Sequence, residues 1–174
     1  QGMGYFVNKR RYRKALLTVG SHTKSIAILG LPSRTLVISQ KLIICPENIR
    51  AKLLPPGEQK IIFLERVSFI DDEPVALLSA FYPAKFTTTL IEQDLNNRSV
   101  YATLFEQNKI TPKHANTVIS LEFSNERLSR LLDIREGTPL FHLDSSTWSN
   151  QEELFEISSN YYRVDRFELE YQQS

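Results

Sequence analysis

The sequence IIFLERVSFIDDEPVALLSAFYP (residues 61–83) contains two apolar runs joined by an acidic turn. Its first nine residues alternate between two faces, which carry Ile61, Phe63, Glu65, Val67 and Phe69 on one side and Ile62, Leu64, Arg66 and Ser68 on the other. An alternation with period two in which neither face is simply polar predicts a strand that is covered on both faces. The turn at 71–73 then predicts a hairpin and a second, antiparallel strand.

A weak copy of this pattern follows at an offset of about 80 residues. The matching pairs are Gly57 with Gly137, Asp71-Asp72-Glu73 with Gln151-Glu152-Glu153, Ser79 with Ser159, and Phe81-Tyr82 with Tyr161-Tyr162. Each copy predicts a strand, a short helix, a glycine turn, a strand, a polar hairpin and a strand. The alternative is a chance likeness between two β-hairpins.

Three short helices are predicted from local signals. Ser124 is a good N-cap for an apolar stripe at Leu128, Leu131 and Leu132. Pro46 suits the first position of a helix in the first copy. Asn97 or Ser99 opens a further helix. Together with the hairpins, these helices predict an α+β fold with a mostly antiparallel sheet and two pseudo-repeated halves.

The composition favours a single domain in a reducing compartment. The chain has 174 residues, a net charge of +1 and one cysteine. It contains neither an apolar run long enough to span a membrane nor a signal-peptide pattern, so we expect a cytoplasmic protein with no membrane partner. The basic cluster at residues 9–14 suits either an arm that touches DNA phosphates or a solvated linker.

Signals for catalysis are weak. The three histidines His22, His114 and His142 lack zinc-ligand spacing, and no nucleophile elbow, phosphate loop or dinucleotide fingerprint occurs. The acidic residues at 71–73 and 152–153 suit solvated hairpin tips. We therefore expect no enzyme activity, no metal and no cofactor.

Three groups could instead hold a small anion. Arg66 and Ser68 share one strand face, and a guanidinium can make a two-pronged bond to phosphate or carboxylate. The helix that opens near Ser99 offers free N–H groups, and residues 21–23 form a polar cluster. Each group also has a simpler interpretation: Arg66 pairs with a core carboxylate such as Glu156, Ser99 only caps a helix, and residues 21–23 are only a loop.

The chain resembles the UTRA effector-binding domain of bacterial GntR-type transcription regulators of the HutC subfamily. The resemblance is carried by Gly2-Met3-Gly4-Tyr5-Phe6-Val7, by Leu64-Glu65-Arg66-Val67 with the hairpin to Tyr82-Pro83, by Leu131-Leu132 with Gly137-Thr138-Pro139-Leu140, and by Tyr162-Arg163-Val164-Asp165-Arg166-Phe167. It implies that residues 1–14 are the end of a DNA-binding wing and a linker. Residues 15–174 are then the small-molecule-binding domain.

The resemblance further implies a chorismate-lyase-like fold, a buried ligand site without catalysis, and a homodimer. In relatives that bind sugar phosphates, the anion is held at the positions of Ser21, His22, Thr23, Arg66, Ser99 and Tyr101, while Glu156 and Tyr162 reach the rest of the ligand. Contact with DNA is expected only through a winged helix-turn-helix that precedes this chain. The implied function is a switch, most commonly a repressor released by its ligand.

Two departures from the family pattern affect the ligand. Many sugar-phosphate binders carry a second arginine where this chain has Ser68, and an acidic residue where it has Leu78. A phosphorylated sugar, a phosphonate, a sulfonate and a carboxylate are therefore all candidate effectors, and His22 could add a pH-dependent donor. Two other functions stay open: a lyase or hydrolase that uses Glu156 or His142, and a purely dimerising module.

Overall fold

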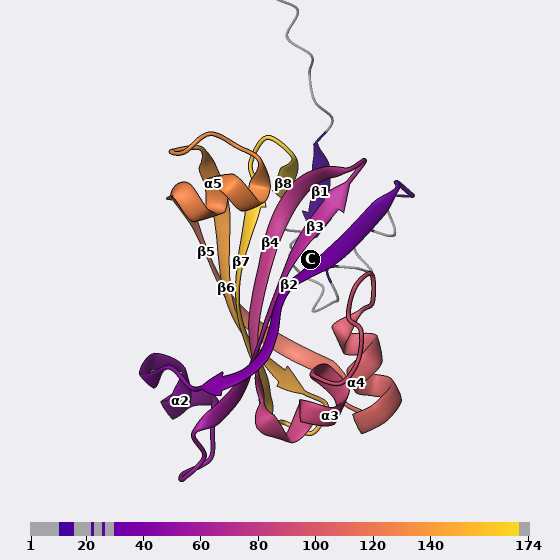
Figure 1. Cartoon of the computed structure of the whole chain (residues 1–174), viewed down its shortest axis with the longest axis vertical. Coiled ribbons are helices and arrows are strands. Elements are labelled where there is room, and N and C mark those ends of the chain that lie inside the picture. The colour runs from indigo at the N-terminus through magenta and orange to yellow at the C-terminus, as the bar shows by residue number, and fades with distance from the viewer. Residues whose placement is uncertain (1–10, 16–21, 23–25, 27–29, 171–174) are drawn as a thin grey trace, which may run out of the picture.

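A six-stranded antiparallel sheet organises the molecule (Figure 1). The computed structural model describes residues 11–15, 22, 26 and 30–170. The sheet has the order β2-β3-β4-β7-β6-β5, with β2 (Ser33–Ile44), β3 (Lys60–Ile70), β4 (Glu73–Pro83), β5 (Pro112–Phe123), β6 (Pro139–Ser149) and β7 (Leu154–Arg163). A separate parallel pair joins β1 (Tyr12–Ala15) to β8 (Phe167–Glu170). The predicted α+β class with a mostly antiparallel sheet is confirmed.

The two predicted halves are also confirmed. The first half runs β2, α2 (Glu47–Leu53), β3 and β4, and the second runs β5, α5 (Glu126–Leu132), β6 and β7. Counted inward from one edge, the sheet has the order β2-β3-β4, and counted inward from the other edge it has the order β5-β6-β7. The equivalent strands of the two halves therefore occupy equivalent places in the sheet. Gly57 and Gly137 both have positive φ, at 90° and 77°, so the matching glycines make the same left-handed turn.

The helices cover the sheet on two sides (Figure 1). On one face, Leu53 of α2 packs with Ile61, and Leu132 of α5 packs with Val67 and Leu140. The other face is covered by η1 (Ala84–Phe86), α3 (Thr87–Leu90) and α4 (Val100–Asn108), whose apolar side chains pack on Ile62 and Leu64. Because β3 is covered on both sides, it carries apolar residues on both of its faces.

Capping decides where two of the helices begin. Ser99 caps α4, and its Oγ accepts a hydrogen bond of 3.3 Å from the N–H of Ala102. The prediction of Ser124 as the cap of α5 is wrong, because Asn125 caps this helix and accepts from Leu128 N at 2.9 Å. The Oγ of Ser124 instead accepts a bond from Thr138 N at 3.0 Å, which ties the strand end to the glycine turn.

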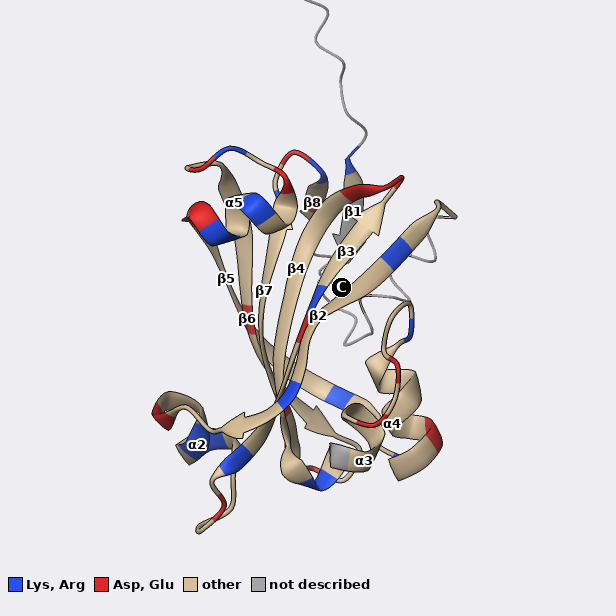
Figure 2. Cartoon of the chain, in the orientation of Figure 1, with Lys and Arg blue, Asp and Glu red and all other residues tan. Residues whose placement is uncertain are grey.

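Charged residues of both signs are interspersed over the described ribbon, although the two charged residues of β2, Arg34 and Lys41, are both basic (Figure 2). Within the described ranges, no helix has the length and apolar character needed to cross a bilayer.

The predicted wing remnant at residues 2–7 lies outside the described residues. Tyr12, which lies within the basic cluster at residues 9–14, is buried, and its N–H donates to Arg166 O.

Candidate functional site

Arg66 lies at the centre of a buried polar cluster. Its position on β3 turns it toward α4, on the same face as Ile62 and Leu64, and the residue is only 8% exposed. Its Nη1 donates a hydrogen bond of 2.9 Å to the carbonyl of Arg98, immediately before the cap of α4. Burial lowers the pKa of Arg66, and Tyr82 and Glu156 oppose this effect. The guanidinium is thus held in place by the backbone that leads into a helix.

Glu156 provides a buried carboxyl in the same cluster. Tyr82 donates to its Oε2 at 2.8 Å and Tyr101 donates to its Oε1 at 3.1 Å. Burial raises the pKa of Glu156, whereas the bonds from the two tyrosines and the charge of Arg66 lower it. Burial and the neighbouring carboxyl hold the pKa of Tyr82 and of Tyr101 well above the ordinary value. Both phenols therefore stay protonated as donors at neutral pH.

His22 joins the cluster from the N-terminal side. Its Nε2 lies 2.8 Å from Ser68 Oγ, and its Nδ1 lies 3.4 Å from the hydroxyl of Tyr162. The rings of His22 and Tyr162 are also in contact, with centroids 5.6 Å apart. Ser68 is therefore a hydrogen-bond partner of the His22 imidazole.

The start of α4 adds a positive end to the cluster. Ser99 is the cap residue, and the first turn contains no acidic side chain. The partial positive charge of the helix N-terminus is therefore not offset by a carboxylate of its own first turn. Because Arg66 is bonded to Arg98 O, its guanidinium lies beside this end. A guanidinium next to a helix N-terminus whose first turn has no acidic side chain is a combination suited to an anion.

The structure thus brings together seven of the nine predicted site residues. They are His22, Arg66, Ser68, Ser99, Tyr101, Glu156 and Tyr162. Ser21 and Thr23 lie outside the described residues. The simpler interpretations are partly right as well, because Ser99 caps a helix and Glu156 is electrostatically coupled to Arg66, although the hydrogen bond of Arg66 goes to Arg98 O.

Sequence reasoning missed three members of the cluster. Tyr82 donates to Glu156 at 2.8 Å, Thr147 interacts with Tyr101, and Ser158 interacts with Glu156. Alternation along β7 could have found Ser158, which shares a face with Glu156 and Tyr162. Tyr82 had no such signal, because its contact with Glu156 joins residues 74 positions apart through the β4–β7 pairing.

His142, the other residue considered for catalysis, lies on the opposite face of the sheet. It stacks on Tyr161 with centroids 4.4 Å apart, and its ring nitrogens lie 2.7 Å from a carboxylate oxygen of Glu122 and 2.7 Å from Ser159 Oγ. Glu156 and His142 therefore cannot act on one ligand as a pair. Among the described residues, no cluster of His, Cys, Asp or Glu could hold a metal ion.

Leu78 occupies the position directly opposite Arg66 in the β3–β4 ladder. A carboxylate at this position would neighbour the guanidinium, whereas the buried leucine leaves Glu156 as the acidic side chain that acts on Arg66. One prediction about acidic turns is wrong at Glu73. This residue is the first of β4 and pairs with Arg163 at 2.9 Å and with Arg166, so it is a structural ion-pair partner and not a solvated turn residue.

Solved structures with this fold are effector domains of transcription regulators. The effector domain of PhnF from Mycobacterium smegmatis matches with a TM-score of 0.85 and 23% identity, over 94% of this chain and 99% of that one. A GntR-family transcriptional regulator from Enterococcus faecalis matches with a TM-score of 0.71 and 23% identity, over 80% of this chain and 99% of that one. The chain therefore shares the fold of effector domains of transcription regulators.

The sequence places the chain in one family of that class. The UTRA domain model matches residues 29–168, so the chain belongs to the UTRA domain family. NagR, an HTH-type transcriptional repressor of Bacillus subtilis, is 25% identical over 167 residues, which are 96% of this chain and 68% of NagR. YurK, an HTH-type regulator of the same organism, is 23% identical over 153 residues, which are 88% of this chain and 63% of YurK.

The chain spans about two thirds of the length of these curated relatives. They and the structural neighbours are transcription regulators and not enzymes, so the prediction of a domain without catalytic activity is confirmed. The chain is an effector-binding domain of such a regulator.

Proposed function

We propose that this domain senses a small anionic metabolite for a cytoplasmic, DNA-binding repressor, and that the anion binds between Arg66 and the N-terminus of α4. The observation that carries the proposal is the buried guanidinium of Arg66, which is anchored on Arg98 O at 2.9 Å beside a helix end without an acidic first turn. A buried cation needs a counter-charge. Glu156 supplies part of it, but its carboxyl is already occupied by two tyrosine hydroxyls.

Ser68 and Leu78 favour a compact anion. One buried arginine and a helix end can hold a single phosphonate, sulfonate, phosphate or carboxylate group. The hydroxyl of Ser68 adds no charge, and Leu78 supplies no acceptor for a sugar hydroxyl. His22 can donate a further bond to the anion when it is protonated, since its imidazole already lies against Ser68.

A continuous set of ring contacts leads from this cluster to β1. His22 contacts Tyr162, the ring of Tyr162 lies 5.2 Å from that of Phe167, and Phe167 contacts Tyr12 of β1 at 6.0 Å. We propose that the residues before β1 connect this strand to a DNA-reading wing, so that ligand binding at His22 changes the position of β1 and of the reading head. For a shift to occur, the ligand must bind the two arrangements with unequal affinity.

The edge strand β5 supports a homodimer. Val118, Leu121 and Phe123 of this strand are exposed, and one edge of β5 has no partner strand among the described residues. A long apolar edge of this kind pairs readily with another strand. A second copy of the chain, related by a two-fold axis, would cover it and set the spacing of two reading heads on a palindromic operator.

A thermal-shift comparison tests the anion site. Glucose 6-phosphate, methylphosphonate, methanesulfonate and acetate represent the four candidate classes. We expect at least one of them to raise the Tm of the parent chain and to lose that effect in Arg66→Ala. Arg130→Ala, which removes an exposed arginine on α5, is the matched control and should keep the effect. An equal shift in Arg66→Ala would refute the site.

A further inference from the structure

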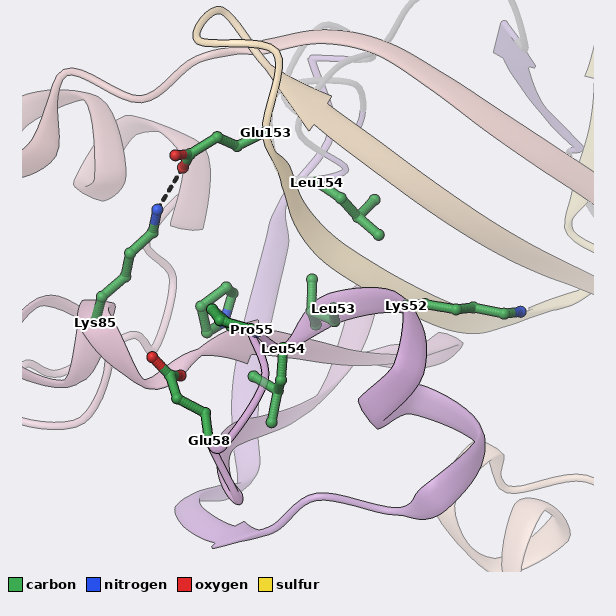
Figure 3. A pocket seen from close by; sticks show the side chains of 9 residues that line it. Lys52, Leu53, Leu54, Pro55, Glu58, Lys85, Glu153 and Leu154 are labelled. Carbon is green, nitrogen blue, oxygen red and sulfur yellow. Dashed lines mark hydrogen bonds and ion pairs between the residues drawn. The ribbon is translucent and has the colours of Figure 1, made fainter.

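A cavity that does not include Arg66 lies between the end of α2, the end of β4 and the β6–β7 hairpin (Figure 3). Its volume is about 350 Å³, which is within the range of small-molecule sites. Nine residues line it: Lys52, Leu53, Leu54, Pro55, Glu58, Pro83, Lys85, Glu153 and Leu154. The walls are thus mainly apolar, and two acidic and two basic side chains balance each other in charge.

The internal repeat provides a second copy of this place in the fold. Pro83 lies opposite Ile61 at the end of the β3–β4 ladder, and Arg163 lies opposite Leu140 at the end of the β6–β7 ladder. Pro83 and Arg163 are therefore equivalent positions. By the same relation, Leu53 at the end of α2 corresponds to Leu132 at the end of α5, and Glu153-Leu154 corresponds to Glu73-Pro74.

In the second half, the corresponding place is filled by a guanidinium. Arg163 is 4% exposed, and its Nη1 donates to Pro74 O at 3.0 Å and to Leu132 O at 3.4 Å. Its Nη2 lies 2.9 Å from Oε1 of Glu73. Asp165 accepts two further bonds from the same guanidinium, from Nε at 3.0 Å and from Nη2 at 2.8 Å. Two backbone carbonyls and two carboxylates thus form a receptor for the planar fork of an arginine.

In the first half, three of these four acceptors have an equivalent and the arginine is missing. The equivalents of Leu132, Pro74 and Glu73 are Leu53, Leu154 and Glu153, which all line the cavity, whereas the equivalent of Asp165 is Lys85. Lys85 binds Oε2 of Glu153, as Arg166 binds Oε2 of Glu73. Among the described residues, none binds Oε1 of Glu153. The position equivalent to Arg163 is a proline, which cannot reach this oxygen or the carbonyls.

We propose that this cavity binds a guanidinium group on a short alkyl stem. The guanidinium would donate to the carbonyls of Leu53 and Leu154 and to Oε1 of Glu153, and the stem would pack on Leu54 and Pro55. A planar fork satisfies such diverging acceptors better than an ammonium does, because its donors are fixed in one plane. The group belongs either to a free small molecule or to an arginine side chain of a polypeptide.

Calorimetric titration of the whole chain with three probes tests this site. Agmatine represents the free molecule, N-acetylargininamide represents an arginine in a polypeptide, and n-butylamine carries the same charge without the fork. We expect saturable binding of at least one guanidinium probe, with the tighter of the two identifying the source, and binding of n-butylamine that is weaker by about tenfold. Equal binding of the amine, or no binding of either guanidinium probe, would overturn the proposal.

Three variants locate the binding. Glu153→Gln should lower the affinity for the guanidinium probe by at least about tenfold. Glu126→Gln, which alters an exposed ion-paired glutamate on α5, should leave this affinity unchanged. Pro83→Arg should abolish binding by supplying the missing guanidinium. Arg66→Ala should leave binding unchanged, which separates this site from the anion site. If Glu153→Gln binds as tightly as the parent, the cavity is not the site.

Discussion

Ser79 and Ser159 lie directly opposite each other in the β4–β7 ladder, and they are also equivalent positions of the two halves. A residue that pairs with its own equivalent marks the pseudo-two-fold axis, so the axis passes through this pair. The axis relates Tyr82 to Tyr162 and Glu156 to Ala76. Tyr82 donates to Glu156, whereas Tyr162 faces Ala76 across the ladder and contacts His22 instead. The candidate anion site therefore lies where the side chains of the two halves differ.

Removing the hydroxyl of Tyr82 should destabilise the fold. Tyr82→Phe leaves Oε2 of the buried Glu156 without its 2.8 Å donor, and the loss of a bond to a charged group costs about 2 kcal/mol. The free energy of unfolding from urea titration measures the loss. Tyr161→Phe is the matched control, because its partner Glu122 is 44% exposed and can bind water, so the expected cost is below about 1 kcal/mol. Equal costs would contradict the buried role of Glu156.

Glu156 should make stability decrease as pH rises. Its folded pKa is raised above the ordinary value of 4.5, so the folded state binds more protons than the unfolded state between the two values. Stability from the protonated form is complete below pH 4.5 and is lost as pH rises through the raised value, with a slope of at most about 1.4 kcal/mol per pH unit. Chemical denaturation from pH 4 upward should show a flatter profile for Glu156→Gln. Identical profiles would show that Glu156 has an ordinary pKa.

Ser68 should contribute to ligand affinity through His22. Ser68→Ala removes the 2.8 Å contact that fixes the imidazole, so we expect the affinity for the best anion to fall about fivefold, corresponding to about 1 kcal/mol. Calorimetric titration measures this change. Ser145→Ala, which removes a hydroxyl paired with Thr117 between β5 and β6, serves as the control with unchanged affinity. If the Ser68→Ala chain binds the anion as tightly as the parent chain, His22 does not belong to the proposed site.

The oligomeric state should depend on β5 and not on β2. Leu121 of β5 is 63% exposed and Ile44 of β2 is 64% exposed, and the two strands form opposite edges of the sheet. Leu121→Lys should convert a dimer into a monomer, whereas Ile44→Lys should keep the dimer, since a charge on an edge strand opposes pairing with another strand. Light scattering after gel filtration gives the mass. A dimer that survives Leu121→Lys would use another surface.

The strands and the repeat could be predicted because their signals are local. Alternation with period two identified both faces of β3, and Gly57 and Gly137 identified two turns that need positive φ. The cap of α5 was harder, since Ser124 and Asn125 are both good capping residues. Only the bond between Ser124 and Thr138 N, across the glycine turn, leaves the capping role to Asn125.

The candidate site could be predicted only in part, because its contacts depend on which strands become neighbours. Arg66 and Ser68 share a face through simple alternation. The contact of Tyr82 with Glu156 depends on the pairing of β4 with β7, which no local pattern specifies. The anchor of Arg66 is a backbone carbonyl, that of Arg98, and any residue type could supply it. Such a contact leaves no trace in the sequence.

A crystal structure of the chain with its bound anion tests the central claim most directly. The ligand should be whichever of glucose 6-phosphate, methylphosphonate, methanesulfonate and acetate raises the Tm most. The account predicts that the anionic group lies within hydrogen-bond distance of the Arg66 guanidinium and of the first N–H groups of α4. An anion bound elsewhere, with Arg66 still bonded only to Arg98 O, would contradict it.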